Sequence, residues 1–470
     1  MTPCLRRSRF NEVLTNLNRS RLFAALLVLG HVQCVSAQDD FFGDLAVSVE
    51  SNNETNKSWT LTGWTRQKAS YGLQAPDPVF SRHQRDWSKV ETSAYVRWDW
   101  QTSENTAIRV AGKGSVDAIY QMRGEENFDP EEVDEFEQRF QWLDVYAESK
   151  FDNQLYIKAG QQIVAWGEAE NLRITDLVNT QDLITFGQQD LENLRLPVPA
   201  LRVNYPFANI LLDAVVTYKA GRDDIAPARD EFDPFIELRP LGARLAIDRP
   251  DKETELFVRL AGSYANGDWG LMVAEANQNS LDARSLGYTG ANLTTVRFSQ
   301  DRFRAIGGSI NFTAGSWLTF AELGLHRDKR MQPSANNLVN FPQGWPEKDQ
   351  VLAAWGLEFN GYHNLIITGE LDYIYTRDHD PRLASDARQL GYSVRALWNG
   401  LNERLQLLAV WTELPDQGGR VGRFTLDYDW SDSIELGLLW VSYSAAQGAP
   451  LYNYRNNDSI QLQFEYSFQH

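Results

Sequence analysis

Residues 460–468 read Ile-Gln-Leu-Gln-Phe-Glu-Tyr-Ser-Phe, two residues before the end of the chain. Apolar and polar side chains alternate at every position of this stretch. Because successive side chains of a β-strand point to opposite faces, the alternation predicts a strand with one apolar and one polar face. The same pattern, repeated along the chain, decides the fold.

The period of two recurs from about residue 93 onward. Its apolar positions include Ala94, Val96, Trp98 and Trp100, then Leu365, Ile367, Gly369, Leu371, Tyr373 and Tyr375, and later Phe424, Leu426, Tyr428 and Trp430. The positions between carry many charges, namely Arg97, Asp99, Arg109, Lys113, Asp117, Glu358, Glu370, Asp372, Arg395, Arg423, Asp427 and Glu435. Charges this frequent within strands are more typical of a wet lumen than of a solvated sheet face, although the pattern alone fits either.

Two further features favour a membrane-spanning barrel. Very short links such as Asn360-Gly361-Tyr362 and Ser431-Asp432 contrast with long polar connections such as 276–300 and 328–350, which is typical of outer-membrane barrels. Aromatic residues near the strand ends would form girdles at both water boundaries. These residues are Trp98, Trp100, Tyr375, Trp398, Trp411, Trp430, Trp440 and Tyr443.

We therefore predict an all-β fold, a transmembrane antiparallel β-barrel of about 16–18 strands. It would occupy residues 57–470 and lie in the bacterial outer membrane. A soluble β-sandwich or propeller is the alternative, but it would not usually need so many aromatic residues on a face that alternates with charges.

The composition excludes several other classes of protein. The chain has 470 residues, with 45 Lys and Arg against 63 Asp and Glu, and a net charge of −18. Nucleic-acid binding requires a basic surface, so we expect no nucleic-acid partner. The mean hydropathy of −0.44 argues against several apolar transmembrane helices, but it is compatible with a barrel, whose strands are only half apolar.

Residues 1–37 have the features of a cleaved secretory signal peptide. A basic region precedes the apolar stretch 22–32, and Val35-Ser36-Ala37 offers a small-residue cleavage site. The apolar stretch is shorter than the roughly 20 residues that a transmembrane helix needs. Cys4 and Cys34 leave with this peptide, which excludes thiol catalysis, disulfides and thiolate metal sites from the mature chain. Residues 38–56 would form an N-terminal lead-in.

Two stretches interrupt the alternation. Residues 124–138 are crowded with Asp and Glu and predict an acidic loop, with divalent-cation bridging to lipopolysaccharide or within the loop as the alternative. Residues 163–199 mix charges with apolar side chains and lack strand alternation. Loops longer than about 15 residues without structure of their own are usually functional. We predict that residues 163–199 fold into the lumen as a constriction or plug, and an external loop is the alternative.

Motifs in and beside this second stretch resemble those of a porin-like outer-membrane family of unknown function. They comprise Gly160, Gln162, Trp166-Gly167-Glu168, Asn179, Asp182, Glu192, Arg195 and Pro197. The family pattern has Arg where this chain has Gln161 and Pro where it has Thr180, so the chain would be a divergent member. The resemblance implies traffic of hydrophobic or lipidic compounds together with an RND-type exporter and a periplasmic protein. The alginate-export porins are a weaker match of similar shape.

The last strand also resembles a known signal. Its alternating aromatic residues are similar to the mark by which the outer-membrane assembly machinery selects its clients, although Gln469-His470 follow the final aromatic residue. We therefore expect that machinery as a partner during biogenesis, and outer-membrane lipid and lipopolysaccharide as partners afterwards.

The sequence shows no motif of a known catalytic or cofactor site. No two histidines are spaced as in a His-Glu-x-x-His zinc site, and neither a Gly-x-Ser-x-Gly elbow nor a phosphate-binding Gly-rich loop occurs. We expect no cofactor, no metal site and no enzymatic activity. An outer-membrane barrel enzyme of lipase or protease type, with its residues on separate strands, and a scaffold or adhesion barrel are the alternatives.

The predicted function is a porin-like channel or export conduit. Trp166, Glu168, Asp182, Glu192 and Arg195 are predicted to form its constriction. Charged side chains in the lumen would set a transverse field and a charge preference. The predicted lumen charges are Arg97, Arg109, Lys113, Asp117, Glu358, Arg395 and Arg423.

Overall fold

The computed structural model describes residues 58–470, except for 75–85, 129, 190–193, 229, 237–241, 291, 335–336, 338–339, 342–344 and 416–417. The predicted signal peptide, residues 1–37, and the predicted lead-in, residues 38–56, lie outside the described residues. In the described part of the chain, no helix has both the length and the apolar character needed to cross a membrane.

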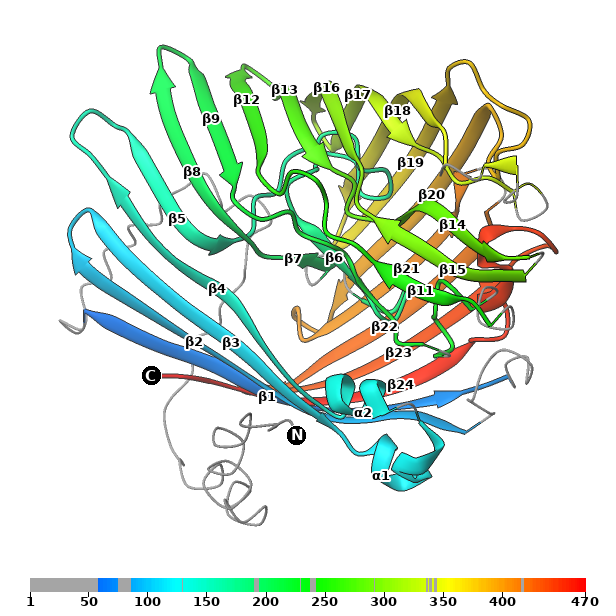
Figure 1. The fold of residues 1–470 in the computed structure, drawn as a ribbon. Coiled ribbons are helices and arrows are strands. Elements are labelled where there is room, and N and C mark those ends of the chain that lie inside the picture. Colours follow the sequence, from blue (N-terminus) through cyan, green and yellow to red (C-terminus); the bar gives the residue numbers. More distant parts are fainter. Residues whose placement is uncertain are drawn as a thin grey trace, which may run out of the picture.

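Eighteen strands form one closed antiparallel sheet (Figure 1). In chain order they are β1 (Trp59–Gly72), β2 (Trp87–Ser103), β3 (Thr106–Asp117), β4 (Gln138–Lys150), β5 (Tyr156–Gln162), β8 (Val198–Phe207), β9 (Ile210–Thr217), β12 (Glu255–Tyr264), β13 (Gly267–Asn277), β16 (Arg302–Ala314), β17 (Trp317–Arg330), β18 (Glu347–Tyr362), β19 (Leu365–Thr376), β20 (Arg388–Gly400), β21 (Leu405–Glu413), β22 (Arg420–Ser431), β23 (Ile434–Ser444) and β24 (Ser459–Gln469). Each strand pairs with the next, and β24 pairs with β1 from Gly72↔Ser459 to Thr62↔Gln469. The predicted antiparallel barrel is confirmed, with 18 strands.

Along the strands, apolar side chains face outward and polar side chains face the lumen. In β17, Leu323 is 61% exposed whereas the neighbouring Glu322 is 3% exposed. In β19, Leu371 is exposed and both Glu370 and Asp372 are buried. An apolar outer face suits lipid, and charges are tolerated only on the inner face, where protein or water can solvate them. The predicted alternation is therefore confirmed.

The two rims of the barrel differ in their connections. Tight turns join β2 to β3, β4 to β5 and the following alternate pairs, all on the rim where β1 begins and β24 ends. The long connections lie on the opposite rim. Outer-membrane barrels place short turns on the periplasmic side and long loops outside, which identifies the periplasmic and extracellular rims. Exposed aromatic side chains flank both rims, with Trp59, Trp100, Trp317 and Trp398 on one side and Trp87, Phe140, Tyr218 and Trp411 on the other.

The acidic stretch 124–138 is not the simple loop that the sequence predicts. Three short helices occupy this connection: α1 (Ile119–Arg123), η2 (Glu125–Asn127) and α2 (Pro130–Phe136). Ile119, Tyr120 and Phe128 are buried together, and Val133 and Phe136 pack against them. These apolar side chains are spaced irregularly among many carboxylates, which is why the sequence pattern concealed the small core that they form.

Six further strands are not part of the barrel wall and form two small sheets of their own. The first sheet contains β6 (Thr180–Leu183), β7 (Arg195–Leu196) and β10 (Asp224–Ile225), and the second contains β11 (Arg244–Ile247), β14 (Asp282–Thr289) and β15 (Asn292–Ser299). The connection predicted as a polar loop at 276–300 is thus largely the β14–β15 hairpin, whose side chains Val296 and Phe298 are buried with Trp345. The short helix η6 (Pro450–Tyr454) lies in the β23–β24 connection.

Candidate functional site

The candidate site is built on residues 163–197, here called the inward segment, which connect β5 to β8. The segment contacts lumen-facing side chains of the barrel wall. The indole Nε1 of Trp166 donates to Asp213 Oδ2 of β9 at 2.9 Å, and Trp166 is 2% exposed. Arg202 of β8 donates to the same carboxylate at 2.8 Å. The segment therefore lies against the lumen-facing side of the wall, where Trp166 anchors its beginning. That it forms a constriction or plug stays a prediction.

Two glycines of the motif stand where the chain must turn sharply. Gly160 has φ +130°, and a Cβ there would lie 2.2 Å from the carbonyl oxygen of Val145. Gly167 has φ +95°, and a Cβ there would lie 2.4 Å from Glu322 Oε1. Positive φ values and such close approaches are compatible only with glycine. Gly160 thus allows the close approach of β5 to β4, and Gly167 allows the segment to turn beside Glu322 of the wall.

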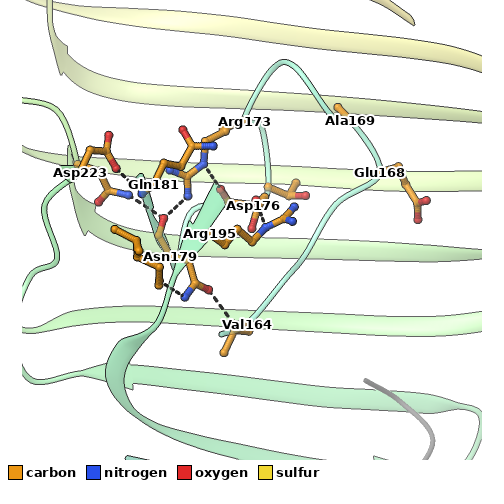
Figure 2. A network of polar contacts seen from close by, with 12 residues as sticks. Val164, Glu168, Ala169, Arg173, Asp176, Asn179, Gln181, Arg195 and Asp223 are labelled. Atoms are coloured by element: carbon orange, nitrogen blue, oxygen red, sulfur yellow. Dashed lines mark hydrogen bonds and ion pairs between the residues drawn. The ribbon is translucent and has the colours of Figure 1, made fainter. Parts of the chain in front are cut away.

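Asn179 joins the two ends of the inward segment through its side-chain amide (Figure 2). Its Oδ1 accepts a hydrogen bond from Val164 N at 2.7 Å. Its Nδ2 donates to Leu196 O at 2.8 Å and to Gln162 O at 3.3 Å. Asn179 has no exposed surface, so these bonds are not shared with solvent. Gln162 extends the network, because its Nε2 donates to Ala200 O of β8 at 2.9 Å.

Charged side chains of the segment fold back on its own backbone (Figure 2). Arg173 Nε donates to Asp176 O at 2.7 Å, and its Nη2 donates to Asn179 O. Arg195 Nε lies 2.9 Å from Asp176 Oδ2. In addition, Gln181 N donates to Asp223 Oδ1 at 2.8 Å. The segment is therefore internally braced, and Arg195 acts within it rather than against the barrel wall.

Two glutamates of the barrel wall hold the middle of the segment by its backbone. Glu322 of β17 accepts hydrogen bonds from the backbone N of Glu168, from Ala169 N at 3.3 Å and from Thr175 Oγ1 at 3.3 Å. Glu370 of β19 accepts from Glu170 N and from Asn171 N, both at 3.0 Å. The two carboxylates therefore fix four consecutive amides of the segment, residues 168–171, to one wall.

Acidic side chains of the segment are poorly solvated. Burial raises the pKa of Glu168, whose Oε1 accepts from Asn311 Nδ2 of β16 at 3.0 Å. Burial likewise raises the pKa of Glu170, which lies 3.8 Å from Arg395 Nη1 of β20. The pKa of Asp182 in β6 is also raised by burial. Hence Glu168 and Glu170 face the wall formed by β16 to β20.

A second connection also enters the lumen. Residues 218–236, here called the strap, follow β9, and β10 within them pairs in parallel with β6 of the inward segment, Asp224↔Asp182. Asp224 Oδ2 lies 2.6 Å from Arg139 Nη2 of β4. Farther on, Tyr454 OH donates to Phe232 O at 3.1 Å, and Phe232 is buried with Tyr443 of β23. The strap thus reaches strands on the far side from β9.

The side chains around the strap show that the prediction for Tyr443 is wrong, and the strap itself is a feature that the sequence did not reveal. Tyr443 was expected in an aromatic girdle, but it is 3% exposed and faces the lumen, where its hydroxyl donates to Phe186 O. The strap itself carries neither strand alternation nor a motif, so only the fold shows that it lies against the inward segment.

The structure places the remaining predicted residues as follows. Arg97 lies 3.0 Å and Arg109 2.6 Å from Asp99, and all three face the lumen with Lys113. Asp117 is buried and caps backbone amides of Val90 and Ile119, so it supports α1 rather than lining a passage. Glu358 accepts from Thr368 Oγ1 at 3.2 Å, and Arg423 Nη1 donates to Gln189 O at 2.5 Å. Pro197 connects β7 to β8, and Glu192 lies outside the described residues.

Charge is distributed unevenly around the lumen. The inner face of β1 to β4 carries Arg66, Lys68, Lys89, Arg97, Arg109, Lys113 and Arg139, opposed by Glu91, Asp99, Asp117, Asp144 and Glu148. The inner face of β17 to β19 carries Glu322, Glu358, Glu370 and Asp372. These two groups of strands face each other across the 18-stranded barrel. The first group, with seven positive against five negative side chains, is here called the cationic wall. The second, with these four carboxylates and the inward-facing Lys329 of β17, is here called the anionic wall, and the inward segment is attached to it.

The described residues contain no group of three or more His, Cys, Asp or Glu side chains placed to hold a metal ion. The wall glutamates Glu322 and Glu370 are the functional residues that the sequence analysis did not assign. Their inward orientation follows from strand alternation, but their bonds to residues 168–171 span more than 150 positions and leave no local signal.

Solved structures with the same fold are distant in sequence. OccAB1 of Acinetobacter baumannii is 9% identical with a TM-score of 0.52, and the match covers 88% of this chain and 97% of that one. OccAB3 of the same species is 8% identical with a TM-score of 0.51, and the match covers 88% and 99% of the two chains. At these identities the likeness shows the fold alone. A search of curated proteins gives no match.

The closed barrel, its apolar outer face and its charged interior place the chain in the bacterial outer membrane. The RND-type exporter and the periplasmic protein implied by the resemblance stay predictions. A family model described as "Protein of unknown function (DUF1302)" matches residues 18–468, nearly the whole sequence. The chain therefore belongs to the DUF1302 family, which agrees with the predicted membership of a family of unknown function.

Proposed function

We propose that this chain is a porin-like channel in which the inward segment narrows the passage. The attachment of residues 168–171 to Glu322 and Glu370 is the observation that carries the proposal. Near its other end the segment is held by Arg423 of β22, which donates to Gln189 O. A chain segment fixed at both places inside the lumen reduces the cross-section that is available to a solute.

The charge distribution supports a preference for anionic solutes. The segment is attached to the anionic wall of β17 to β19, and the cationic inner face of β1 to β4 lies across the lumen from that attachment. Charged side chains lining a pore set its ion selectivity. A solute with a carboxylate or phosphate group would be attracted to Arg66, Lys68 and Lys113 along that face.

The proposal also extends to the class of compound that passes through the channel. The family resemblance implies hydrophobic or lipidic compounds moved with an RND-type exporter, and the cationic wall favours anions. Amphipathic anions satisfy both requirements, since the charged group would follow the wall while the apolar part remains in the wider lumen. Loss of export of such a compound from cells that lack the chain, with the exporter intact, would support this part.

The channel itself is tested by single-channel recording of the refolded mature protein in a planar bilayer. We expect steady openings for the wild type. The double variant Glu322→Gln, Glu370→Gln replaces each two-oxygen acceptor by an amide with a single acceptor oxygen. This should loosen residues 168–171 and give a larger mean conductance or frequent fluctuations between conductance levels. Glu358→Gln is the control, because Glu358 faces the same lumen from β18 but accepts its hydrogen bond from Thr368 of the neighbouring wall strand.

Silence of a correctly folded wild-type barrel would contradict the channel and would favour a barrel enzyme or a scaffold. Openings that are the same in the double variant and the wild type would contradict the role given to the inward segment. An equal change in Glu358→Gln would mean that lumen charge alone, rather than attachment of the segment, determines the conductance.

A further inference from the structure

A row of arginines lies on the outer surface of the barrel at the extracellular rim. We call it the outer arginine row, and its members are Arg302 and Arg304 of β16, Arg327 of β17, Arg377 directly after β19, Arg388 of β20 and Arg420 of β22. Strand alternation places these side chains on the lipid-facing side. Arg304 shares a face with the exposed Ile306, Arg327 with Leu323, and Arg388 with Leu390.

Strand pairing sets these arginines side by side. Glu275 of β13 is paired with Arg304, and Arg304 is paired in turn with Arg327. Asp349 of β18 lies 3.7 Å from Arg327 Nε and 3.8 Å from Arg377 Nη1. Arg388 is paired with Tyr375, two residues before Arg377. The row is therefore continuous over seven neighbouring strands, from β16 to β22.

Positive charge exceeds negative charge along the row. Three carboxylates pair with members of the row: Glu275 pairs with Arg302 at 2.8 Å, Asp349 lies between Arg327 and Arg377, and Glu413 pairs with Arg420. Glu347, on the same face of β18 as Asp349, pairs with Arg330, which is not a member of the row. The six arginines thus carry an excess of three positive charges over Glu275, Asp349 and Glu413. Among the residues that the structure describes, Arg304 and Arg388 have no ion pair. The side chains of Arg327 and Arg377 are 60% and 55% exposed.

The row occupies only part of the circumference. At the extracellular ends of β1, β3, β9 and β24, the outermost outward side chains are Tyr71, Val116, Val216 and Ile460. These residues are apolar or aromatic, so a requirement shared by the whole rim does not explain the arginines. The outer arginine row is thus a feature of the sector from β16 to β22.

The height of the row matches the boundary between lipid and water. Arg327 and the exposed Trp317 face outward from opposite ends of β17 and are ten residues apart. At about 3.3 Å per residue and a tilt of about 40°, they are separated by roughly 25 Å along the membrane normal, which is the height of the apolar band of such barrels. The arginines therefore meet the headgroups of the outer leaflet, directly above exposed Ile306, Leu323 and Leu390.

We propose that the outer arginine row is a binding site for lipid A, the phosphorylated anchor of lipopolysaccharide. Guanidinium groups bind phosphate through paired hydrogen bonds, and the excess charge of the row complements the two phosphates of lipid A. The aliphatic side chains below the arginines provide the surface on which several acyl chains would lie. The site is independent of the proposed channel, because its residues face away from the lumen.

The test measures retention of lipid A by the purified full-length barrel. The protein in detergent is mixed with bis-phosphorylated, hexa-acylated lipid A, and bound lipid is counted by native mass spectrometry. The variant Arg304→Gln, Arg327→Gln, Arg388→Gln should reduce the affinity for lipid A at least about tenfold. The matched control Arg249→Gln, Arg297→Gln, Arg382→Gln removes the same charge from exposed positions outside the row and should bind like the wild type.

Three results would overturn the proposal. Unchanged retention by the row variant would show that these arginines do not bind the lipid. An equal loss in the control variant would show a general effect of charge. Equally tight binding of phosphatidylglycerol, or full competition by inorganic phosphate, would show that the row attracts any anion. Folding of each variant is verified by its heat-modifiable migration, so a loss of binding is not a loss of structure.

Discussion

At the scale of single residues, the side-chain amide of Asn179 is important for the structure of the inward segment. Its side chain satisfies Val164 N, Gln162 O and Leu196 O, which lie at the two ends of the inward segment. Val164, Gln162 and Asn179 have no exposed surface, so water cannot replace the missing partner there. Other side chains of this size cannot offer two donors and an acceptor in the same geometry, and even aspartate lacks the donors.

Asn179→Ala should therefore lower the free energy of unfolding by about 2–3 kcal/mol, because a buried donor and two buried acceptors lose their partner. Urea titration of the barrel refolded into lipid vesicles measures this difference. Asn153→Ala removes an asparagine that bonds only one backbone amide at an exposed turn, and it should cost less than about 1 kcal/mol. Equal losses for the two variants would contradict the special position of Asn179.

At the scale of elements, the ease of prediction differs sharply between strands and connections. Strands such as β19 and β24 can be predicted because each residue's environment is encoded by its immediate neighbours in an alternating pattern. The inward segment can be located because alternation stops there, and its direction was inferred from its mixed character. The helices around Phe128 could not be predicted, because the apolar residues of their small core are spaced irregularly among carboxylates. The strap could not be predicted, because Phe232 is buried against strands far away in the sequence.

The docking of the inward segment should depend on pH. Burial raises the pKa of Glu168 and Glu170 in the folded state, so each carboxyl binds its proton more tightly when the segment is docked. Their contribution to docking is complete below the ordinary pKa of about 4.3 and is lost as pH rises through the raised pKa. Lowering the pH from about 7 to about 5 should thus reduce current fluctuations of the open channel.

Single-channel noise recorded at both pH values measures this effect. The variant Glu168→Gln, Glu170→Gln keeps the size of both side chains and cannot titrate, so the part of the pH dependence that these residues cause should disappear. If the variant retained the full dependence, other lumen groups would be responsible. If acidification increased the noise of the wild type, the sign derived from the raised pKa values would be wrong.

At the scale of the whole molecule, two cationic surfaces lie on opposite sides of one barrel wall. Arg66, Lys68 and Lys113 face the lumen from β1 and β3, whereas Arg304, Arg327 and Arg388 face lipid from β16, β17 and β20. The net charge of −18 gives no hint of either surface, since composition carries no information about which face a residue occupies. The two groups are separated because the sheet closes into a barrel. The inner group would then act on a solute in the lumen, and the outer group on the membrane lipid.

This separation predicts opposite effects for two variants that each lose three positive charges: one should change ion selectivity and the other should change lipid A binding. Arg66→Gln, Lys68→Gln, Lys113→Gln should shift the reversal potential in a salt gradient toward cation preference, because three positive charges leave the wall that faces the passage. The same variant should retain lipid A like the wild type. Arg304→Gln, Arg327→Gln, Arg388→Gln should give the opposite pair of results, with reversal potential unchanged and lipid A lost. A shift in reversal potential of equal size in both variants would mean that the two surfaces are not electrically separated by the wall, and the assignment of inner and outer roles would fail.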